Sequence, residues 1–555
     1  MTNAKHGTNL LNNPLLNKGT AFSHTEREKF GLIGLLPPRV ETIEEQAFRA
    51  YIQYGASSGD LEKNLFLNRL FSTNVTLFYY LVSSHLEEML PIVYTPTIGD
   101  AVKQFSRNFV QPHGLVISLT DRGRIEEIMA TIDPEQLDIA VVTDGEGILG
   151  IGDWGIGGLN IAIGKLMVYT LCGGVNPHRT LPVQLDVGTN NQELLTDPLY
   201  LGLRQPRASG QEYLDFIDEF VTAFKKRLPR SFLHWEDFGR DNARCVLDRY
   251  RESHQSFNDD IQGTGSVALA AVLAGMARSG LPADQHRFCI FGAGTAGCGI
   301  ADQICLALAK SQNCDPTEMR QRFYLIDREG LLIENSHNIM PFQQPYAVAT
   351  DRLSGWINRS PDRISLIDVV KNARPTVLIG CSAQAGAFTD DVLAEMSRNC
   401  HYPIIMPLSN PTIKAEATPE RILAATEGRA LIATGSPFSP ASWQSKKIKV
   451  AQCNNALVFP GIGLGMLISQ ATQLSDSMLL AGSAALSRFT QKTGDCCALL
   501  PDFSNILQIS KAVAIAVAEE AANSGNAELK TADQIEAAYK KHLWAPAYRQ
   551  PVQAS

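Results

Sequence analysis

The sequence has little of what membrane and secreted proteins need. Residues 1–19, MTNAKHGTNLLNNPLLNKG, are polar and Asn-rich and contain no long apolar stretch. The most apolar internal run, Val267 to Met276, is interrupted by Gly275 and is shorter than the roughly 20 apolar residues of a bilayer span. We therefore expect a chain that is neither secreted nor embedded in a membrane.

An excess of positive charge and a pattern of paired cysteines are also missing. The chain has 49 Lys and Arg against 57 Asp and Glu, with the basic residues scattered, so nucleic acid or an anionic membrane is excluded as the main partner. A local anion site stays open. The 11 cysteines, from Cys172 to Cys497, show no zinc-type spacing, and their odd number disfavours a disulfide framework. These features predict a reducing, cytoplasmic location.

The features that are present indicate a large globular α/β enzyme. At 555 residues, 45% hydrophobic and 19% charged, the chain predicts at least two domains. Residues 1 to about 20 are expected to form a flexible or partner-contacting arm. Helical periodicity over 42–90 predicts a helical N-terminal region, and the apolar segments 92–94, 138–144 and 181–188 predict short buried strands.

A second α/β series is predicted after a helix over 263–278. Its expected strands lie at 287–294, 322–328, 375–382, 402–410 and 430–436, with segments long enough for helices between them. This alternation is typical of a parallel, doubly wound sheet. The chain closes with Ala-rich helical stretches, including 509–525.

A glycine loop with dinucleotide-binding spacing begins this series. Gly292, Gly294 and Gly297 follow an apolar strand and precede a helical stretch, so a pyrophosphate could approach the helix N-terminus. Asp327 ends the next strand, where it could bind an adenosine ribose, although its distance from the loop exceeds the usual spacing of about 20 residues. The alternatives are a tight turn without a ligand, and NADP binding helped by Arg328. The pattern favours NAD.

Two short motifs concentrate carboxylates among apolar neighbours. They are LHWEDFGR, with Glu236 and Asp237, and SFNDDIQGTG, with Asp259 and Asp260. Buried acids are costly unless a cation or hydrogen bonds satisfy them, and an oxygen-only set suits Mg²⁺ or Mn²⁺. The alternative is that these acids cap helices or pair with arginines, namely Arg240, Arg244 and Arg249.

Together these motifs carry a resemblance to a known family. The matching stretches run in order from Asn17 to Gly465: NKGTAFS, YTPTIGDAV, VVTDGEGILGIGD, GKLMVYT, LDVGTNN, HWEDFGR, FNDDIQGTG, FGAGTAGCGIA, PLSNPT, ATGSPF and QCNNALVFPGIGLG. The chain resembles the malic enzymes, a family that includes the malolactic enzymes. The resemblance implies NAD-dependent oxidative decarboxylation of L-malate to pyruvate, CO₂ and NADH with Mn²⁺ or Mg²⁺. Its alternative is malolactic conversion of L-malate to L-lactate and CO₂ with NAD retained.

The resemblance also implies roles for individual residues. Lys165 matches the catalytic lysine, a base if its pKa is depressed, and Tyr94 matches the catalytic tyrosine, an acid. Asp259 is expected to assist Lys165 or to bind cofactor. The remaining implied contacts are metal at Glu236, Asp237 and Asp260, substrate or nicotinamide at Asn410 and Asn454, and cofactor at Asp260 and Asn410.

One position departs from the oxidative pattern. Oxidative malic enzymes usually carry an Arg where this chain has Gly147, and that Arg contacts the substrate carboxylate. Gly147, Trp154, GKLMVYT and the pair His234–Trp235 resemble the malolactic branch, whereas YTPTIG and LDVGTNN fit malic enzymes equally well.

Two rival interpretations come from other classes. A non-catalytic NAD-binding protein has no physical need for buried acids beside a lysine. A metal-free hydroxyacid or amino-acid dehydrogenase would explain the glycine loop but not the carboxylates.

The expected organisation has four parts. They are a helical N-terminal domain (1–112), an α/β metal- and substrate-binding domain (113–259), a Rossmann-like doubly wound NAD-binding domain (260–454), and a C-terminal segment (455–555) that returns to the substrate domain and ends in a helical tail. The active site is expected between the second and third parts. The resemblance further implies a homodimer or homotetramer.

Overall fold

The chain forms two compact units, each with its own sheet. The computed structural model describes residues 6–148, 150–336, 338–360, 363–493, 498–527 and 531–548. The first unit comprises Met1–Glu236 and Lys540–Ser555, and the second comprises Asp237–Tyr539. The chain therefore passes from one unit to the other at the Glu236–Asp237 peptide. The domain boundaries expected at 112/113, 259/260 and 454/455 stay predictions.

The first unit begins with helices, as the periodicity over 42–90 predicted. Thr42 starts one of them through a capping box: its hydroxyl accepts the N–H of Glu45 at 3.3 Å, and the Glu45 carboxylate accepts the N–H of Thr42 at 3.0 Å. Asn74 caps another by accepting the N–H of Leu77 at 2.9 Å. The α-helices before the first strand are α1 Gly7–Leu11, α2 His24–Lys29, α3 Ile43–Gly55, α4 Asp60–Thr73, α5 Val75–Ser84, α6 Leu86–Val93, α7 Ile98–Lys103 and α8 Phe105–Asn108.

Two sequence expectations for this region are wrong. The flexible arm is wrong for its described part, because α1 carries Leu10 into a fully buried cluster with Phe22 and Leu32; residues 1–5 lie outside the described chain. The strand expected at 92–94 is also wrong, because Ile92 and Val93 end α6. A run of two or three apolar residues fits a helix as well as a strand.

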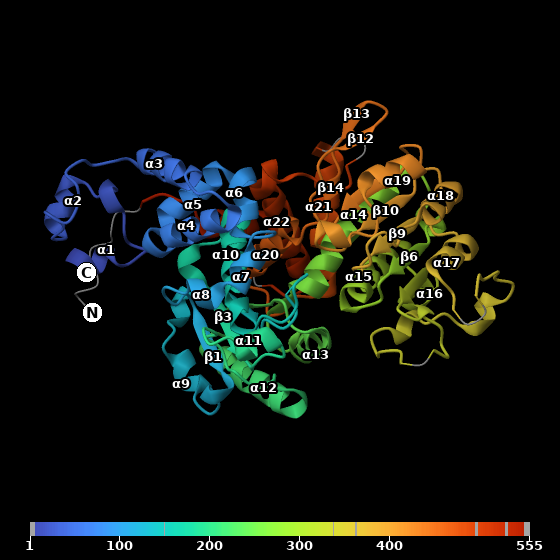
Figure 1. Ribbon diagram of the computed structural model, residues 1–555, viewed down its shortest axis with the longest axis horizontal. Coiled ribbons are helices and arrows are strands. Elements are labelled where there is room, and N and C mark those ends of the chain that lie inside the picture. The colour runs from blue at the N-terminus through green and yellow to red at the C-terminus, as the bar shows by residue number, and fades with distance from the viewer. Residues whose placement is uncertain are drawn as a thin grey trace. The chain divides into compact units, whose positions relative to one another are not determined.

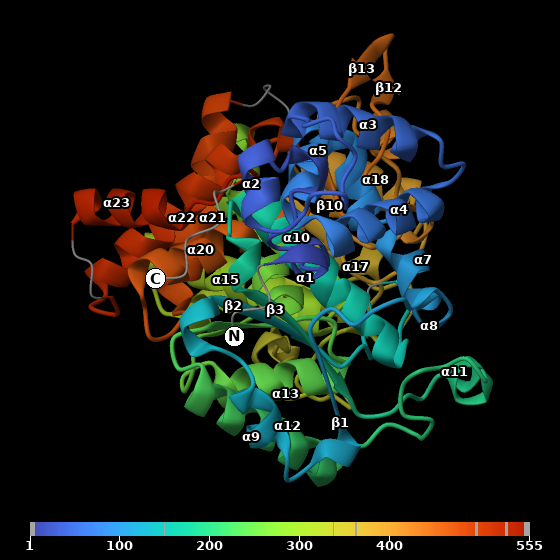
Figure 2. The ribbon, with the colours of Figure 1, turned by 90° about the vertical axis from the view of Figure 1, so that its left-hand side faces the viewer.

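A parallel sheet follows the helices. Four strands lie in the order β1–β3–β2–β4, with every pair parallel. Figure 2 shows α10 on one side of β2 and β3, with α9 and α12 on the other. The bounds are β1 Leu115–Ser118, α9 Ile125–Ala130, β2 Ile139–Thr143, α10 Leu159–Gly173, β3 Thr180–Asp186, α11 Gln192–Thr196, α12 Gly210–Arg227 and β4 Phe232–Trp235. Since parallel strands end at one edge, Glu236, which follows β4, lies at the edge where β2 and β3 also end.

The end of the chain returns to these helices. The Trp544 N–H donates to the carbonyl of Gly174 at 2.8 Å, and the Trp544 ring packs edge-on against Tyr79 with centroids 5.4 Å apart. The Tyr548 hydroxyl donates to Gln46 Oε1 at 2.6 Å. The C-terminal residues thereby fasten α3, α5 and α10 together.

The second unit contains the predicted doubly wound sheet. Its strands lie in the order β14–β11–β10–β9–β6–β7–β8. All neighbouring pairs are parallel except β7–β8, in which the edge strand β8 runs antiparallel to β7. Figure 1 shows α14 and α15 on one side of β6, β9 and β10, and α17 and α18 on the other. All five strands expected from the sequence are present. The bounds are β6 Phe288–Phe291, β7 Phe323–Asp327, β8 Gly330–Leu331, β9 Val377–Gly380, β10 Ile404–Pro407, β11 Leu431–Thr434 and β14 Ala451–Gln452. The second unit also contains β5 Ser256–Asn258, which is not part of this sheet, and a separate hairpin of β12 Ala441–Trp443 and β13 Lys446–Ile448.

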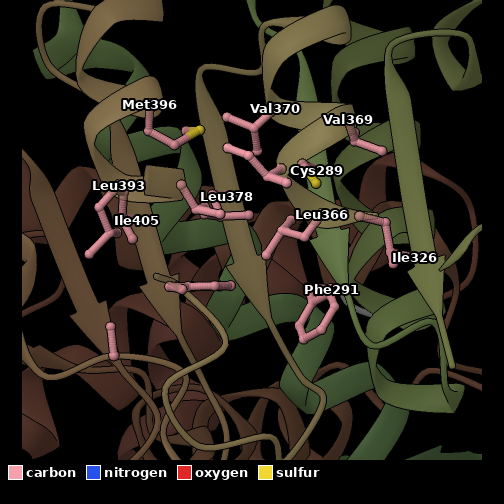
Figure 3. Close-up of a cluster of buried hydrophobic side chains, with 14 of the residues drawn as sticks. Cys289, Phe291, Ile326, Leu366, Val369, Val370, Leu378, Leu393, Met396 and Ile405 are labelled. Carbon is pink, nitrogen blue, oxygen red and sulfur yellow. The ribbon is translucent and has the colours of Figure 1, made fainter. Parts of the chain in front are cut away.

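Apolar side chains fill the space between this sheet and its helices. In Figure 3, Val370 from α17 lies over Leu378 of β9 and Leu393 from α18 lies beside Ile405 of β10, while Val369 lies on the side of Ile326 of β7. The helices of the second unit are α13 Arg240–Tyr250, α14 Thr264–Ser279, α15 Thr295–Gln312, α16 Pro316–Arg320, α17 Leu366–Ala373, α18 Asp390–Asn399, α19 Pro419–Ala425, α20 Phe459–Ser469, α21 Asp476–Thr493 and α22 Ile506–Asn523, and α23 Ala532–His542 follows them. Burial of these strands on both faces explains why each reads as a continuous apolar run.

Among the residues that the structure describes, two helical stretches are long and apolar enough to cross a membrane by length and composition. They are Gly155–Gly173 and Asp259–Ser279, of which 89% and 78% of the most apolar window is buried inside the protein. The second stretch is longer than the apolar run seen in the sequence. Both are core helices of the units in which they lie.

Candidate active site

A buried ion pair lies at the end of β4 in the first unit. Lys165 sits in the middle of α10, and its Nζ is 2.6 Å from Glu236 Oε1, with the two side chains 3% and 4% exposed. Two buried charges of opposite sign lose their hydration, so the pair persists only with close geometry and further polar partners. Those partners are Tyr94 and His234.

Tyr94 approaches the same carboxylate oxygen from the end of α6. Its hydroxyl donates to Glu236 Oε1 at 3.4 Å, and its ring centroid lies 5.3 Å from Lys165 Nζ. Gly164 permits this approach, because a Cβ there would lie 3.0 Å from Tyr94 Cδ2 and 3.3 Å from the carbonyl of Val93. The two residues expected to act as base and acid therefore converge on one oxygen atom.

His234 lies at the other oxygen of Glu236, and Tyr169 lies at the far side of the His234 ring. Neither was predicted as a site residue. His234 Nε2 is 2.7 Å from Glu236 Oε2, and Nδ1 is 2.8 Å from the Tyr169 hydroxyl. The signals were present in the sequence: His234 precedes Glu236 by two positions and so shares its face of the strand, and Tyr169 follows Lys165 by one helical turn.

In the second unit, the structure brings Asp237 and Asp260 together. Asp260 Oδ2 accepts the backbone N–H of Asp237 at 2.8 Å. Asp237 has φ of 55°, a left-handed conformation that is uncommon outside glycine but that Asp tolerates. Left-handed backbone at a non-glycine residue is a feature of functional sites, because the surrounding structure must hold it in place.

Asp259 is fully buried beside an asparagine that was not predicted. Asn455 Nδ2 lies 2.9 Å from Asp259 Oδ2 and 3.0 Å from the Thr264 hydroxyl. Gly263, at the end of the π-helical turn Asp259–Gly263, leaves room for the carboxylate, since a Cβ there would overlap Asp259 Oδ1. The neighbouring Asn454, which is predicted to contact the substrate or the nicotinamide, caps a short helix through its Oδ1, which accepts the N–H of Ala456 at 2.9 Å.

Two of the three arginines offered as alternative partners for these acids pair with other carboxylates. Arg240 lies 3.9 Å from Asp327 Oδ2, and Arg244 lies 2.9 Å from Asp248 and 3.3 Å from Asp302. The helix-cap alternative also fails for the turn at Asp259, where Asn258 Oδ1 accepts the N–H of Ile261 at 2.9 Å. For Arg240 and Arg244, the pairing alternative is therefore wrong.

The glycine loop adopts the strand-to-helix context that was predicted, between β6 and α15. Gly292 has φ of 111°, and a Cβ there would lie 2.5 Å from the Cys381 carbonyl after β9. At Gly297 a Cβ would overlap the carbonyl oxygen of Gly292, whereas at Gly294 it would meet nothing within 4 Å. Because β6 and β9 flank the point at which the strand order reverses, the loop lies where doubly wound sheets bind ligands.

Asp327, at the end of β7, is tied to this loop. Gln343 Nε2 donates both to Asp327 Oδ2 at 2.7 Å and to the carbonyl of Ala293 at 2.6 Å. Asp327 Oδ1 accepts the N–H of Arg328 at 2.8 Å, and the Arg328 side chain is exposed. The carboxylate predicted to bind ribose is thus held in a fixed orientation beside the loop.

Asn410 lies in the loop after β10. Its Oδ1 accepts a hydrogen bond from the Ser436 hydroxyl, after β11, and its Nδ2 lies 3.4 Å from the carbonyl of Leu408. The buried Glu416 joins the neighbouring loops, accepting from the Ser382 N–H at 2.9 Å and the Ser409 hydroxyl at 2.5 Å. The carboxyl ends of β9, β10 and β11 are therefore bound to one another.

Thiol chemistry is not available near the glycine loop. Burial raises the pKa of Cys298 well above its ordinary value, and burial with Glu416 nearby does the same for Cys381. Both remain protonated thiols at neutral pH, and a thiol is a weak nucleophile. Acid–base chemistry at this loop therefore does not come from these two cysteines.

Known proteins match the chain over nearly its whole length. The family model "Malic enzyme, N-terminal domain" matches residues 71–251, and "Malic enzyme, NAD binding domain" matches residues 261–522. The NAD-dependent malic enzyme of Pectobacterium carotovorum subsp. carotovorum (strain PC1) is 48% identical over 545 residues, which is 98% of this chain and 96% of the relative. The chain belongs to the malic enzyme family. The enzyme of the same name from Escherichia coli (strain SMS-3-5 / SECEC) is 46% identical over 544 residues, with the same two shares covered.

Solved malic enzymes have the same fold. The malic enzyme of Entamoeba histolytica superposes with a TM-score of 0.56 at 22% identity, covering 92% of this chain and 91% of that one. The malic enzyme of Pyrococcus horikoshii Ot3 gives 0.54 at 24% identity, covering 82% and 89%. The resemblance read from the motifs is confirmed, and the glycine loop lies inside the matched NAD binding domain.

Proposed function

We propose that this malic enzyme family member oxidatively decarboxylates L-malate to pyruvate and CO₂ with reduction of NAD to NADH. The observation that carries the proposal is the convergence of Lys165 and Tyr94 on Glu236, in a chain 46–48% identical to enzymes named NAD-dependent malic enzyme. A lysine and a tyrosine buried against one carboxylate suit a reaction that removes one proton and delivers another.

The donor set fits a hard divalent cation. Glu236, Asp237 and Asp260 would hold it, all through oxygen, as Mn²⁺ and Mg²⁺ prefer. The hydrogen bond from Asp237 to Asp260 joins two of these residues, and the peptide bond keeps the third within about 3.8 Å of Asp237, Cα to Cα. When bound, the ion supplies Lewis-acid stabilisation of negative charge on substrate oxygens, and NAD supplies the hydride acceptor.

Lys165 and Tyr94 divide the proton transfers in this mechanism. The neutral Lys165 amine takes the proton of the C2 hydroxyl while hydride leaves C2. The proton it gains makes an ammonium, the form that pairs with Glu236 at 2.6 Å. After the β-carboxyl group has left as CO₂, the Tyr94 hydroxyl delivers a proton to C3 of the enolate, giving pyruvate, and the Lys165 ammonium returns its proton to Tyr94.

The other predicted site residues keep the roles that the resemblance implied. Asp259 assists Lys165 or binds cofactor, and its bond to Asn455 fixes the carboxylate for either role. Asn410 and Asn454 contact the substrate or the nicotinamide, and Gly292, Gly294, Gly297 and Asp327 bind NAD, with Asp260 and Asn410 alongside.

The malolactic alternative concerns the fate of the hydride. Gly147, exposed between β2 and α10, stands where the oxidative pattern has an Arg, but relatives named NAD-dependent malic enzyme favour the oxidative reaction. Purified protein is given malate, NAD and Mn²⁺, and NADH is followed by absorbance while pyruvate and lactate are assayed separately. Equal amounts of NADH and pyruvate are expected. Lactate with only traces of NADH would overturn the proposal.

The metal assignment has its own test. Asp260→Asn keeps an oxygen that can accept the Asp237 N–H but lacks the charge that a cation needs, so malate turnover and Mn²⁺ binding should be lost while NAD binding persists. Asp248→Asn is the matched control, because Asp248 is 51% exposed and pairs with Arg244. Undiminished turnover by Asp260→Asn in metal-free buffer would contradict the assignment.

We also propose a cytoplasmic homodimer or homotetramer. Phe48 and Ile52, one turn apart on α3, are 69% and 58% exposed, and Ile33 is 71% exposed. Large apolar side chains exposed one turn apart on a helix, as Phe48 and Ile52 are, are typical of protein interfaces. Light scattering should give a molar mass that is a multiple of the chain's and that falls in Phe48→Lys/Ile52→Lys, but not in Ile357→Lys, a control with 83% exposure. A monomeric wild type would refute it.

A further inference from the structure

We propose that His234 is a positioning residue that fixes the orientation of the Glu236 carboxylate, which faces Lys165 and Tyr94 and would be a ligand of the divalent ion. This inference rests on the proposed metal-dependent function. It concerns a buried row of four side chains in the first unit, Tyr169, His234, Glu236 and Lys165, which are 0%, 0%, 3% and 2% exposed.

Hydrogen-bond chemistry sets the direction of the contact between His234 and Glu236. A carboxylate can only accept, so His234 Nε2 carries a hydrogen and donates it to Glu236 Oε2 across 2.7 Å, whatever the state of the other ring nitrogen. Nδ1 lies 2.8 Å from the Tyr169 hydroxyl, which can donate or accept. Both ring nitrogens are therefore held, and the imidazole cannot rotate without losing two buried hydrogen bonds.

The row is anchored on two rigid elements. His234 pairs in register with Val141 inside the parallel sheet, and its ring packs edge-on to that of Tyr169 with centroids 5.6 Å apart. Tyr169 and Lys165 are one turn apart on α10. The same helix thus holds one carboxylate oxygen directly, through Lys165, and the other indirectly, through Tyr169 and His234.

The consequence for Glu236 is a fixed ligand. With Oε2 bound to His234 and Oε1 to Lys165, the carboxylate cannot rotate without losing both contacts. Hydrogen-bond partners of ligating carboxylates and histidines typically change metal affinity or activity by about 10- to 100-fold when they are removed. We expect a loss of that size for Mn²⁺ when the His234 donor is removed.

The experiment measures Mn²⁺ binding by calorimetry and by the electron paramagnetic resonance of free Mn²⁺, without malate or NAD. His234→Leu removes the donor and should raise the Kd for Mn²⁺ about 10- to 100-fold. His234→Gln places an amide N–H near the former Nε2 and should restore most of the affinity. Tyr169→Phe should raise the Kd by a smaller factor, because it frees the ring without removing the donor.

His286→Leu is the matched control, since His286 is also fully buried, in the second unit, with Nδ1 2.9 Å from the Thr376 hydroxyl. It should lose thermal stability and keep the wild-type Mn²⁺ affinity. If His234→Leu does not fold, the comparison of His234→Gln with His234→Asn, whose shorter amide falls short of Glu236, replaces it.

The outcomes separate the inference from the proposed function. Failure of the wild type to bind Mn²⁺ would overturn the metal assignment itself. Binding by the wild type with equal Kd in His234→Leu, or equal losses in His234→Leu and His234→Gln, would overturn the role of His234 alone. A selective loss rescued by Gln supports positioning, because a purely structural role would affect stability and not the order of affinities.

Discussion

The two units build their parts of the candidate site in different ways. In the first unit, the row from Tyr169 to Lys165 consists of buried side chains whose orientation depends on one another. In the second unit, the glycine loop depends on backbone conformation, with Gly292 at φ of 111° and Gly294 facing open space. Removing one functional group should therefore disrupt the row of side chains in the first unit. Adding one methyl group at a glycine should disrupt the loop in the second unit.

The largest effect is expected at Lys165. Lys165→Ala should lower kcat by at least about a hundredfold, the usual scale for a lost general base. Since the change leaves Glu236 without its ion-pair partner, thermal unfolding must be measured alongside. Lys165→Arg keeps a cation beside Glu236 but cannot act as a base, and it should be equally inactive while folding better.

Lys226→Ala is the control for this prediction, because Lys226 is 66% exposed and pairs with Glu126 at the surface. Its kcat should equal that of the wild type. A Lys165→Ala enzyme with unchanged kcat and a raised KM would show that Lys165 only binds malate.

In the second unit, the effect of a Gly→Ala substitution should depend on which glycine of the loop is changed. Gly292→Ala places a Cβ 2.5 Å from the Cys381 carbonyl at a left-handed φ, so the second unit should lose stability and NAD binding together. Gly294→Ala meets no protein atom within 4 Å and has an extended backbone, so it should fold normally. Only a ligand drawn close to the loop would meet that methyl group.

We therefore expect Gly294→Ala to have wild-type thermal stability and about tenfold weaker NAD binding, a loss of about 1.4 kcal/mol. Calorimetric titration with NAD measures the second quantity. Wild-type NAD affinity in Gly294→Ala would mean that the pyrophosphate does not approach the loop at this glycine.

The same contrast explains what the sequence could predict. The five strands of the second sheet were predictable because each is a fully buried apolar run followed by a turn, and the glycine spacing marked the loop directly. Residues 92–94 were misread because three apolar residues fit both a helix end and a strand. The packing of Leu10 against Phe22 and Leu32 was missed because polar asparagines dominate the composition around it.

For the site, sequence reasoning found residues with a distinctive motif and missed those that act through neighbours. From the sequence, His234 was noted only as a feature that resembles the malolactic branch. Its spacing of two residues from Glu236 nevertheless predicts that both side chains lie on the same face of the strand. The bond between Asn455 and Asp259 was missed, since nothing in two adjacent amides tells which one turns toward a carboxylate. The left-handed backbone of Asp237 has no sequence signal, because Asp adopts that conformation only when tertiary contacts impose it.

A smaller effect is expected from cofactor choice. Asp327 is held beside the glycine loop by Gln343, and its charge would repel the 2′-phosphate of NADP. NAD should be used more efficiently than NADP, and Asp327→Ser should reduce the ratio of the two kcat/KM values by about tenfold. Arg328→Ser is the control. If that variant moves the ratio and Asp327→Ser does not, the exposed arginine determines cofactor choice.

The smallest effect on activity is expected from a substitution at Asp153, in the loop between β2 and α10 that also carries Gly147. This loop is held both by side-chain contacts and by its backbone. Its Asp153 is bound by Arg207 Nε at 2.8 Å and by the N–H of Asn190 at 2.7 Å. Burial alone would raise the pKa of Asp153, but Arg207 and these hydrogen bonds together hold it below its ordinary value. A lowered pKa in the folded state means that the stabilising contribution is present above the unfolded pKa of about 3.9 and is lost as the pH falls through the folded value.

Asp153→Asn should therefore be less stable than the wild type at pH 7, by about 1.5–3 kcal/mol for a charged hydrogen bond, and the difference should shrink as the pH approaches 3. Thermal unfolding midpoints at pH 7, 5, 4 and 3 measure this, with Asp391→Asn, 70% exposed beside Arg359, as the control that should not change. A difference that stays constant down to pH 3 would show that Asp153 acts through packing, and not through its charge.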